Sequence, residues 1–302
     1  MFSIKTLINS VHSFFFKDHD TKGIGLFRII WGVLLFAYFL FEVGNLDNYY
    51  GTKSILSLKS SLGQFNYPHL NIFQYIGVED QTLYSFMAIY GIAIICFTIG
   101  FYTKQTLIIL FICMVSLHQR NIWLLSSCDL LIRLITFYLI FTPCERSISL
   151  DQSRLNLKQA APVWGLRLIQ IQISVVYIWT VWQKLKGESW LDGTAVYYAT
   201  RLEAFKNVEL PWLLDSMFNL KVISWGTLML EFGIGVLVWF KECKKLLVLI
   251  GIIFHLGIEV LMSIPFFEIV MIILLSTYIL DELVFTLSKL MRNKSIPQVL
   301  LK

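Results

Sequence analysis

The stretch that decides the fold, residues 165–193, reads GLRLIQIQISVVYIWTVWQKLKGESWLDG. Its first twenty residues are apolar and long enough to cross a bilayer as one helix. Five polar residues nevertheless recur at spacings of three, four, three and seven: Arg167, Gln170, Ser174, Tyr177 and Lys184. These spacings place all five on one helix face. Because an ionisable group at mid-bilayer costs about 2.5–3.5 kcal/mol, the stripe is predicted to face other helices or a cavity.

Arg167 and Lys184 also admit a purely structural interpretation. Each stands near one end of the predicted helix, where a long cationic side chain can extend to the membrane surface while its stem stays in lipid. An ionisable residue inside a membrane segment is nevertheless a functional candidate by default. Both interpretations therefore remain open from the spacing alone.

The composition is that of a membrane protein. Of 302 residues, 57% are hydrophobic and only 15% are charged, whereas a soluble domain carries about a quarter charged residues. The mean hydropathy is +0.68. The formal charge of +5 fits basic loop ends that hold helices in register, and it does not indicate a nucleic-acid partner. The five cysteines lack disulfide or zinc spacing, so no metal site is predicted.

Hydropathy predicts an all-α, polytopic helical bundle of about eight transmembrane helices. The apolar segments are residues 23–43, 83–101, 105–117, 124–143, 165–184, 223–240, 246–264 and 266–285. We expect three regions: an amphipathic cytoplasmic segment without a cleaved signal peptide (1–22), a transmembrane domain (23–285) and a basic cytoplasmic tail (286–302). Lys and Arg favour the loops that place both termini in the cytoplasm. An amphipathic surface helix is predicted over residues 194–205.

Ionisable residues recur within the predicted spans. Asp129 and Arg133 are four residues apart, as are His255 and Glu259, and that spacing permits contact on one helix face. Because mutual pairing lowers the cost of burial, we expect the intramembrane ionisable groups to converge in one buried cavity. They are Arg28, Asp129, Arg133, Lys184, Glu231, His255 and Glu259. Locking helices together is an equally good account of the Asp129–Arg133 pair.

Several stretches, taken together, resemble one known family. They are GLFRIIWG (25–32), HQRNIWLLSSCDLLIRLITFYLIFTPCERSISLD (118–151), YIWTVWQKLKGESWLDGTAVYY (177–198), LEFGIGVLVWF (230–240) and IIFHLGIEVLMSIPFFEIVMI (252–272). In this order they are similar to the motifs of the horizontally transferred transmembrane (HTTM) domain family. That domain is also the membrane part of vitamin K-dependent gamma-carboxylase. The resemblance covers about residues 20 to 285.

The resemblance implies a site. Lys184, directly before Leu185 and seven residues after Tyr177, matches the lysine that acts as base on reduced vitamin K, so a reduced quinone is the cofactor that the resemblance implies. A lysine can do this only in its uncharged form. On the same grounds we assign Lys184, Asp129 and His255 to catalysis. Substrate binding is assigned to Arg28, Tyr177, Trp190 and Glu231.

The chain also departs from the carboxylase pattern. Cys128 stands where the carboxylase has an active-site histidine, and bulky residues, 181–183, precede the lysine. The resemblance does not extend to the carboxylase's lumenal substrate-binding domain. Two functions therefore remain: quinone-coupled or peptide-modifying chemistry with Lys184 as base, or a non-enzymatic membrane factor for maturation or export of a partner peptide. The expected setting is the bilayer of a bacterial cytoplasmic membrane, with a peptide or soluble protein partner.

Overall fold

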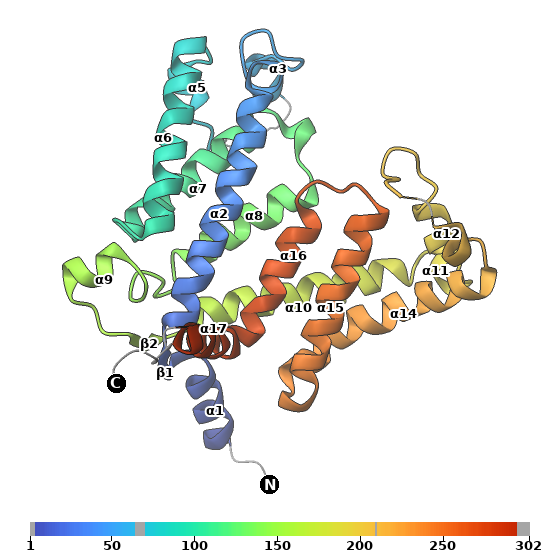
Figure 1. Cartoon of the computed structure of the whole chain (residues 1–302). Helices are drawn as coiled ribbons and strands as arrows, with labels where there is room; N and C mark the ends of the chain where they lie inside the picture. The colour runs from blue at the N-terminus through green and yellow to red at the C-terminus, as the bar shows by residue number, and fades with distance from the viewer. Residues whose placement is uncertain (1–3, 64–69, 209, 295–302) are drawn as a thin grey trace, which may run out of the picture. The chain divides into compact units, whose positions relative to one another are not determined.

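The computed structural model describes residues 4–63, 70–208 and 210–294, and these residues are mainly helical (Figure 1). The chain divides into two compact units, Met1–Arg167 with Leu280–Lys302, and Leu168–Ile279. The part of the predicted basic tail at residues 295–302 lies outside the described residues.

The elements of the first unit, in chain order, are α1 (Ile4–Phe16), β1 (Asp18–Asp20), α2 (Lys22–Gly44), α3 (Leu46–Tyr49), α4 (Leu58–Leu62), α5 (Phe73–Ile76), α6 (Asp80–Ile99), α7 (Thr103–Arg120), η1 (Ile122–Leu124), α8 (Ser127–Leu139), α9 (Leu150–Leu155), β2 (Ala160–Pro162) and α17 (Leu280–Lys294). Helix α10 (Trp164–Lys184) begins in this unit and continues into the second. The remaining elements of the second unit are α11 (Glu188–Leu191), α12 (Ala195–Ala199), α13 (Pro211–Leu214), α14 (Met217–Val236), η2 (Leu237–Trp239), α15 (Lys241–Leu261), α16 (Phe267–Ser276) and η3 (Thr277–Ile279).

The all-α membrane fold is confirmed, whereas the number of eight spans is not. Five of the described helical segments are long and apolar enough to cross a membrane: Lys22–Gly44, Asp80–Ile99, Trp164–Lys184, Met217–Trp239 and Phe267–Thr286. Helices also occupy the other three expected positions, as α7, α8 and α15. Helix α8 has 13 residues, about 20 Å at 1.5 Å per residue, against a hydrocarbon core of about 30 Å. It is therefore too short to cross by itself.

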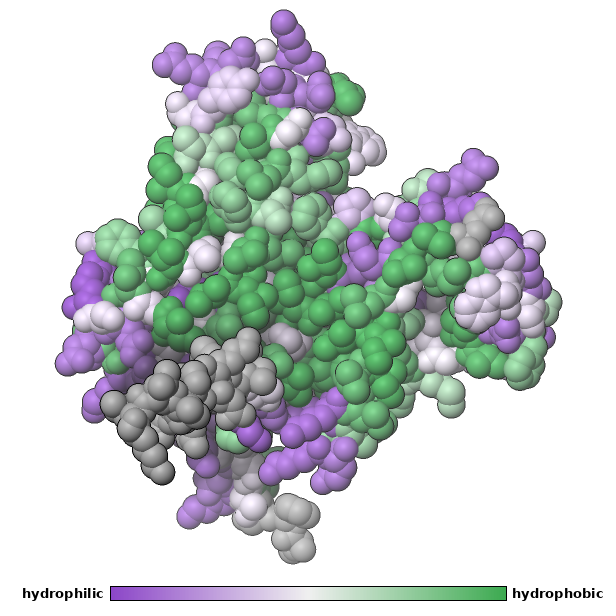
Figure 2. All heavy atoms as spheres, viewed as in Figure 1, coloured by the Kyte–Doolittle hydropathy of each residue, from purple (hydrophilic) through white to green (hydrophobic). Residues whose placement is uncertain are grey.

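In the first unit, α2 packs along α6, α6 packs on α7, and α17 lies against α2 (Figure 1). Strands β1 and β2 pair antiparallel, with His19 opposite Ala161. None of the residues of α1 is buried. Hydrophobic side chains cover the middle of the long helices, and hydrophilic residues gather around α3 at one end (Figure 2). This distribution is the one that a bilayer requires, because apolar side chains meet lipid and polar ones meet water.

The middle of the polar stripe of α10 is buried, as the sequence predicts, whereas Arg167 and Lys184 at its two ends are partly exposed. Gln170, Ser174 and Tyr177 are all shielded, whereas Trp179 and Trp182 on the opposite face are exposed. In a bilayer the large apolar side chains of that second face would meet lipid. The stripe therefore faces protein, where its hydrogen-bonding groups find partners.

The predicted helix over residues 194–205 is wrong in length. Only Ala195–Ala199 forms a helix, α12. Beyond it the backbone of Lys206 forms an antiparallel bridge with Met262. The amide of Asn207 donates to the carbonyl oxygen of Leu261 at 3.1 Å, and the amide of Ser263 donates to that of Phe205 at 2.7 Å. Backbone pairing to the end of α15 therefore replaces the last helical turns.

Candidate functional site

Lys184, the last residue of α10, forms an ion pair with Glu231 of α14. Glu231 is buried, and the Lys184 side chain is 22% exposed, so the pair stands at the edge of the protein interior. The Lys184 ammonium also lies 4.6 Å from the ring centroid of Trp190, within the range of a cation–π contact. The second carboxylate oxygen of Glu231, Oε2, is buried and has no hydrogen-bond partner among the described residues.

A second series of hydrogen-bonded side chains begins two turns before Lys184 on the same helix. The Tyr177 hydroxyl and His255 Nε2 are 2.6 Å apart, and His255 Nδ1 bonds to Glu268 Oε2. These residues come from α10, α15 and α16. Their exposed fractions are 2%, 3% and 1%. Three hydrogen-bonding side chains in series, fully enclosed by an apolar interior, form a polar network in which every member has a partner.

The rest of the α10 stripe fixes the helix against η3. The Gln170 side-chain amide donates to the carbonyl oxygen of Thr277 at 2.8 Å. The Tyr278 hydroxyl donates to the carbonyl oxygen of Gln170 at 2.6 Å, and the Trp239 indole donates to Ser174 Oγ at 2.9 Å. Two of these bonds tie a side chain to backbone and the third joins two side chains, and together they hold α10 in one rotation and so aim Tyr177 at His255.

A tight turn follows α11, the short helix that carries Trp190. Asp192 Oδ1 accepts hydrogen bonds from the Thr194 hydroxyl and amide, and these bonds lower the pKa of Asp192. Gly193 follows with φ of +80°, and a Cβ there would lie 2.6 Å from Lys221 Cγ. Both the backbone conformation and the space thus require glycine. This explains physically why a glycine stands three residues after the tryptophan.

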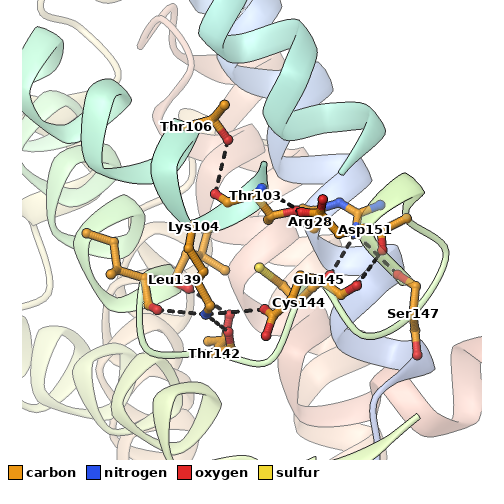
Figure 3. A network of polar contacts seen from close by, with 12 residues as sticks. Arg28, Thr103, Lys104, Thr106, Leu139, Thr142, Cys144, Glu145, Ser147 and Asp151 are labelled. Atoms are coloured by element: carbon orange, nitrogen blue, oxygen red, sulfur yellow. Dashed lines mark hydrogen bonds and ion pairs between the residues drawn. The ribbon is translucent and has the colours of Figure 1, made fainter. Parts of the chain in front are cut away.

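Arg28 lies in the first unit and has a different role, which is to hold a loop. Its guanidinium is buried and donates to three backbone carbonyl oxygens: Cys144 at 2.6 Å, Ser147 at 3.2 Å, and Ile148 (Figure 3). These carbonyls belong to the connection between α8 and α9. Arg28 therefore anchors a loop that would otherwise carry unsatisfied buried backbone groups.

Helix α9, which follows this connection, carries Asp151 in its first turn, and Asp151 caps the start of α7 (Figure 3). Asp151 accepts hydrogen bonds from the Thr103 amide at 2.7 Å, the Thr103 hydroxyl at 2.8 Å and the Tyr102 amide at 3.1 Å. It also pairs with Arg154 at 2.8 Å. Burial by itself would raise the pKa of Asp151, but these hydrogen bonds and the Arg154 charge outweigh it and hold that pKa below its usual value.

Asp129 is also engaged in structure. Its Oδ2 accepts hydrogen bonds from the amide (2.6 Å) and hydroxyl (2.8 Å) of Ser126, which completes a capping box at the start of α8. Its Oδ1 accepts from the Tyr38 hydroxyl at 2.6 Å. Both oxygens are thereby used, and the spacing to Arg133 does not produce an ion pair. Cys128, beside it, is buried.

The expectation that the ionisable groups converge in one cavity is therefore wrong. Arg28 and Asp129 lie in two networks of the first unit that share no residue. Lys184, Glu231, Trp190, Tyr177 and His255 lie together in the second unit. Arg28 finds its hydrogen-bond acceptors in backbone carbonyls, and Asp129 finds its donors in a helix cap. Neither charge therefore needs a distant charged partner.

Glu268 is a site residue that the sequence did not predict. Its signal was present, because it is the single charged residue of the apolar segment FEIVMIILLS that forms α16. Thr180 was also missed. Its hydroxyl acts on the Glu231 carboxylate as a hydrogen-bonding group, although its geometry favours donation to the Tyr177 carbonyl oxygen at 2.9 Å. A threonine in a membrane helix carries no comparable signal, since such hydroxyls usually bond to their own backbone.

The family model described as HTTM domain matches residues 16–282, which is most of the chain. One curated relative is the Bacillus subtilis (strain 168) protein named "Uncharacterized protein YitO". It is 25% identical over 253 residues, which cover 78% of this chain and 74% of the relative. No solved structure matches the chain.

Proposed function

Because this chain belongs to the HTTM domain family, a multi-pass membrane family related to the carboxylase membrane domain, we propose that it is a membrane enzyme that removes a proton from a lipid-soluble substrate at Lys184. A reduced quinone of a bacterial cytoplasmic membrane is the proposed substrate. The observation that carries this proposal is the unfilled hydrogen-bonding position of Glu231 Oε2 beside Lys184. A buried acceptor without a donor is costly, and a substrate hydroxyl would supply that donor.

The side chains around the pair fit such a ligand. In this proposal Glu231 Oε2 accepts a hydrogen bond from the substrate hydroxyl, and Lys184 Nζ, which pairs with the other carboxylate oxygen, takes the proton. The indole of Trp190 offers a flat apolar surface next to the ammonium. The quinol itself supplies an acidic hydroxyl and, after deprotonation, reactivity toward oxygen.

A second function is favoured by the ion pair itself. Glu231 and Trp190 both stabilise Lys184 as a cation. If that is their whole purpose, the pair joins α10 to α14 in a non-enzymatic membrane factor for maturation or export of a partner peptide. The two functions differ in whether Lys184 must release a proton.

Replacement of Lys184 by arginine separates them. Guanidinium keeps the charge and the ion pair but stays protonated. We expect Lys184→Arg to fold to wild-type levels and to lose the oxygen-dependent oxidation of reduced menadione, measured by absorbance with the full chain in phospholipid vesicles. Lys206→Arg, at a lysine of the α12–α13 connection, is the matched control and should retain the wild-type rate. An unchanged rate in Lys184→Arg would exclude Lys184 as the base.

A further inference from the structure

A groove in the first unit shares no residue with the Lys184 centre. It opens between α6 and α7 near α5 and has a volume of about 800 Å³, which is within the range of small-molecule sites. We propose that this α6–α7 groove binds one acyl chain of a membrane phospholipid with a primary-amine headgroup, and that Glu79 recognises the amine. The groove has a polar part, formed by Glu79, Gln81, Thr82 and Ser85, and an apolar part, which includes Ile76, Phe86, Ile89, Ile109 and Ile112.

The groove has the depth of one membrane leaflet. Its polar part lies at the start of α6, at the hydrophilic end of this unit beside α3 (Figures 1 and 2). There the Tyr84 hydroxyl of α6 donates to Oδ1 of Asp47 on α3 at 3.2 Å. From Glu79 to Ile89 the chain advances ten residues, about 15 Å at 1.5 Å per residue. This is half of a hydrocarbon core of about 30 Å, so a lipid of one leaflet fits with its headgroup at the polar part.

The apolar part suits a hydrocarbon chain. Helix α6 packs on α7, and the buried side chains of Phe86 and Cys113 form the floor of the groove. The exposed side chains of Ile89, Ile109 and Ile112 stand along it. An acyl chain in the groove would therefore contact side chains of two helices at once. Each such contact adds dispersion energy that a chain on a smooth helix face does not gain.

The turn before α6 places the Glu79 carboxylate at the polar part. Glu79 is the N-cap residue of α6, but its side chain makes no bond to that helix. Gly77 has φ of +77°, and a Cβ there would collide with Glu79 Oε2, so glycine leaves the space that the carboxylate occupies. Glu79 is exposed, and no residue among 4–63, 70–208 and 210–294 forms a hydrogen bond or ion pair with its carboxylate. The carboxylate is thus available to a headgroup.

The charges at the polar part select the headgroup. Of the described residues that line the groove, Glu79 alone is charged. A primary ammonium can give its carboxylate a charge-assisted hydrogen bond. No side chain caps the start of α6, so the amides of its first turn are open to an anion such as a lipid phosphate. Phosphatidylethanolamine carries both charges. Phosphatidylglycerol carries only the negative one, and the choline nitrogen of phosphatidylcholine has no hydrogen to donate.

Photo-crosslinking in a membrane tests the proposal. The full chain is placed in phosphatidylcholine vesicles with a small fraction of either phosphatidylethanolamine or phosphatidylglycerol, each carrying the same diazirine-bearing acyl chain. Peptide mass spectrometry then gives the labelling of residues 72–113 relative to the exposed apolar face of α14, which includes Met229 and Phe232. This reference measures ordinary lipid contact. We expect phosphatidylethanolamine to label the groove more than the α14 face, and about threefold more than phosphatidylglycerol does, which is the scale of an exposed ion pair.

Glu79→Gln should make the two lipids label the groove equally. Asp80→Asn is the matched control, because Asp80 is exposed and next in the chain but does not line the groove, and it should keep the threefold preference. Ile112→Trp should fill the groove and lower its labelling by both lipids. Equal labelling by the two lipids in the wild type, or a preference that Asp80→Asn abolishes as fully as Glu79→Gln, overturns recognition of the amine. Groove labelling no higher than that of α14 overturns the site itself.

Discussion

Replacing Asp151 by asparagine tests whether this residue of the first turn of α9 has a structural role. Each carboxylate oxygen of Asp151 accepts two hydrogen bonds: Oδ2 from the amide and hydroxyl of Thr103, and Oδ1 from the Tyr102 amide and Arg154. Asparagine keeps one acceptor oxygen and turns an NH₂ group toward the donors of the other. Whichever way the amide is turned, two charge-assisted bonds are lost.

Two such bonds, at about 1.5 kcal/mol each, give an expected loss of about 3 kcal/mol in the free energy of unfolding at pH 7. The measurement is denaturant unfolding of the purified chain in detergent. The matched control is Asp215→Asn. Asp215 pairs with Arg201 at 2.8 Å, the same distance as Asp151 to Arg154, but its side chain is 64% exposed. An exposed pair contributes at most about 1 kcal/mol, so this variant should stay close to the wild type.

The pH dependence has a definite sign. Because the hydrogen bonds hold the folded pKa of Asp151 below its unfolded value of about 3.9, the stabilisation is complete above that value and is lost as pH falls through the folded pKa. The gap between wild type and Asp151→Asn should therefore be full at pH 7 and shrink below about pH 4. A gap under about 0.5 kcal/mol at pH 7, or one that widens in acid, would refute a capping role for Asp151.

Three further outcomes are expected. Arg28→Lys should lower the free energy of unfolding by about 2 kcal/mol, because an ammonium cannot reproduce the guanidinium's planar contacts with the three loop carbonyls; wild-type denaturant stability would contradict it. Gly100→Ala should cost about 2 kcal/mol or more in the same assay, since φ is +74° and a Cβ would lie 2.4 Å from Ser149 Cβ. A reporter fused after Lys302 should be cytoplasmic, and an external reporter would mean that a span is miscounted.

The spacing of polar and apolar residues predicted those features that depend on a single helix. The spacing from Arg167 to Lys184 is enough to show that α10 has a polar face, because a buried polar group must find a partner wherever the helix packs. It does not reveal the partner. The bond from Tyr177 to His255 joins residues 78 positions apart, and nothing in either helix encodes the register of the other. The family resemblance named most of these residues, but it did not name their contacts.

Two helix predictions failed, for the span over residues 124–143 and for the helix over residues 194–205, because local hydrogen bonds end or start the helices elsewhere. The capping box of Ser126 and Asp129 starts α8 inside the segment that hydropathy reads as a continuous span. The backbone bridge from Lys206 to Met262 ends the amphipathic pattern after α12. Both events depend on backbone donors and acceptors, which hydropathy does not count.

The networks around Arg28 and Asp151 differ in kind from those around Lys184 and His255. In the first unit, Arg28 donates to backbone carbonyls, and Asp151 accepts from the start of a helix. Carbonyls cannot give up a proton, so such contacts fix the chain in place. In the second unit, the bonds from Lys184 to Glu231 and from Tyr177 through His255 to Glu268 join titratable side chains to one another. A proton can cross each of these bonds without any movement of the backbone. Because their bonds join titratable groups, the networks around Lys184 and His255 are suited to proton transfer, whereas the Arg28 and Asp151 networks are suited to holding the fold.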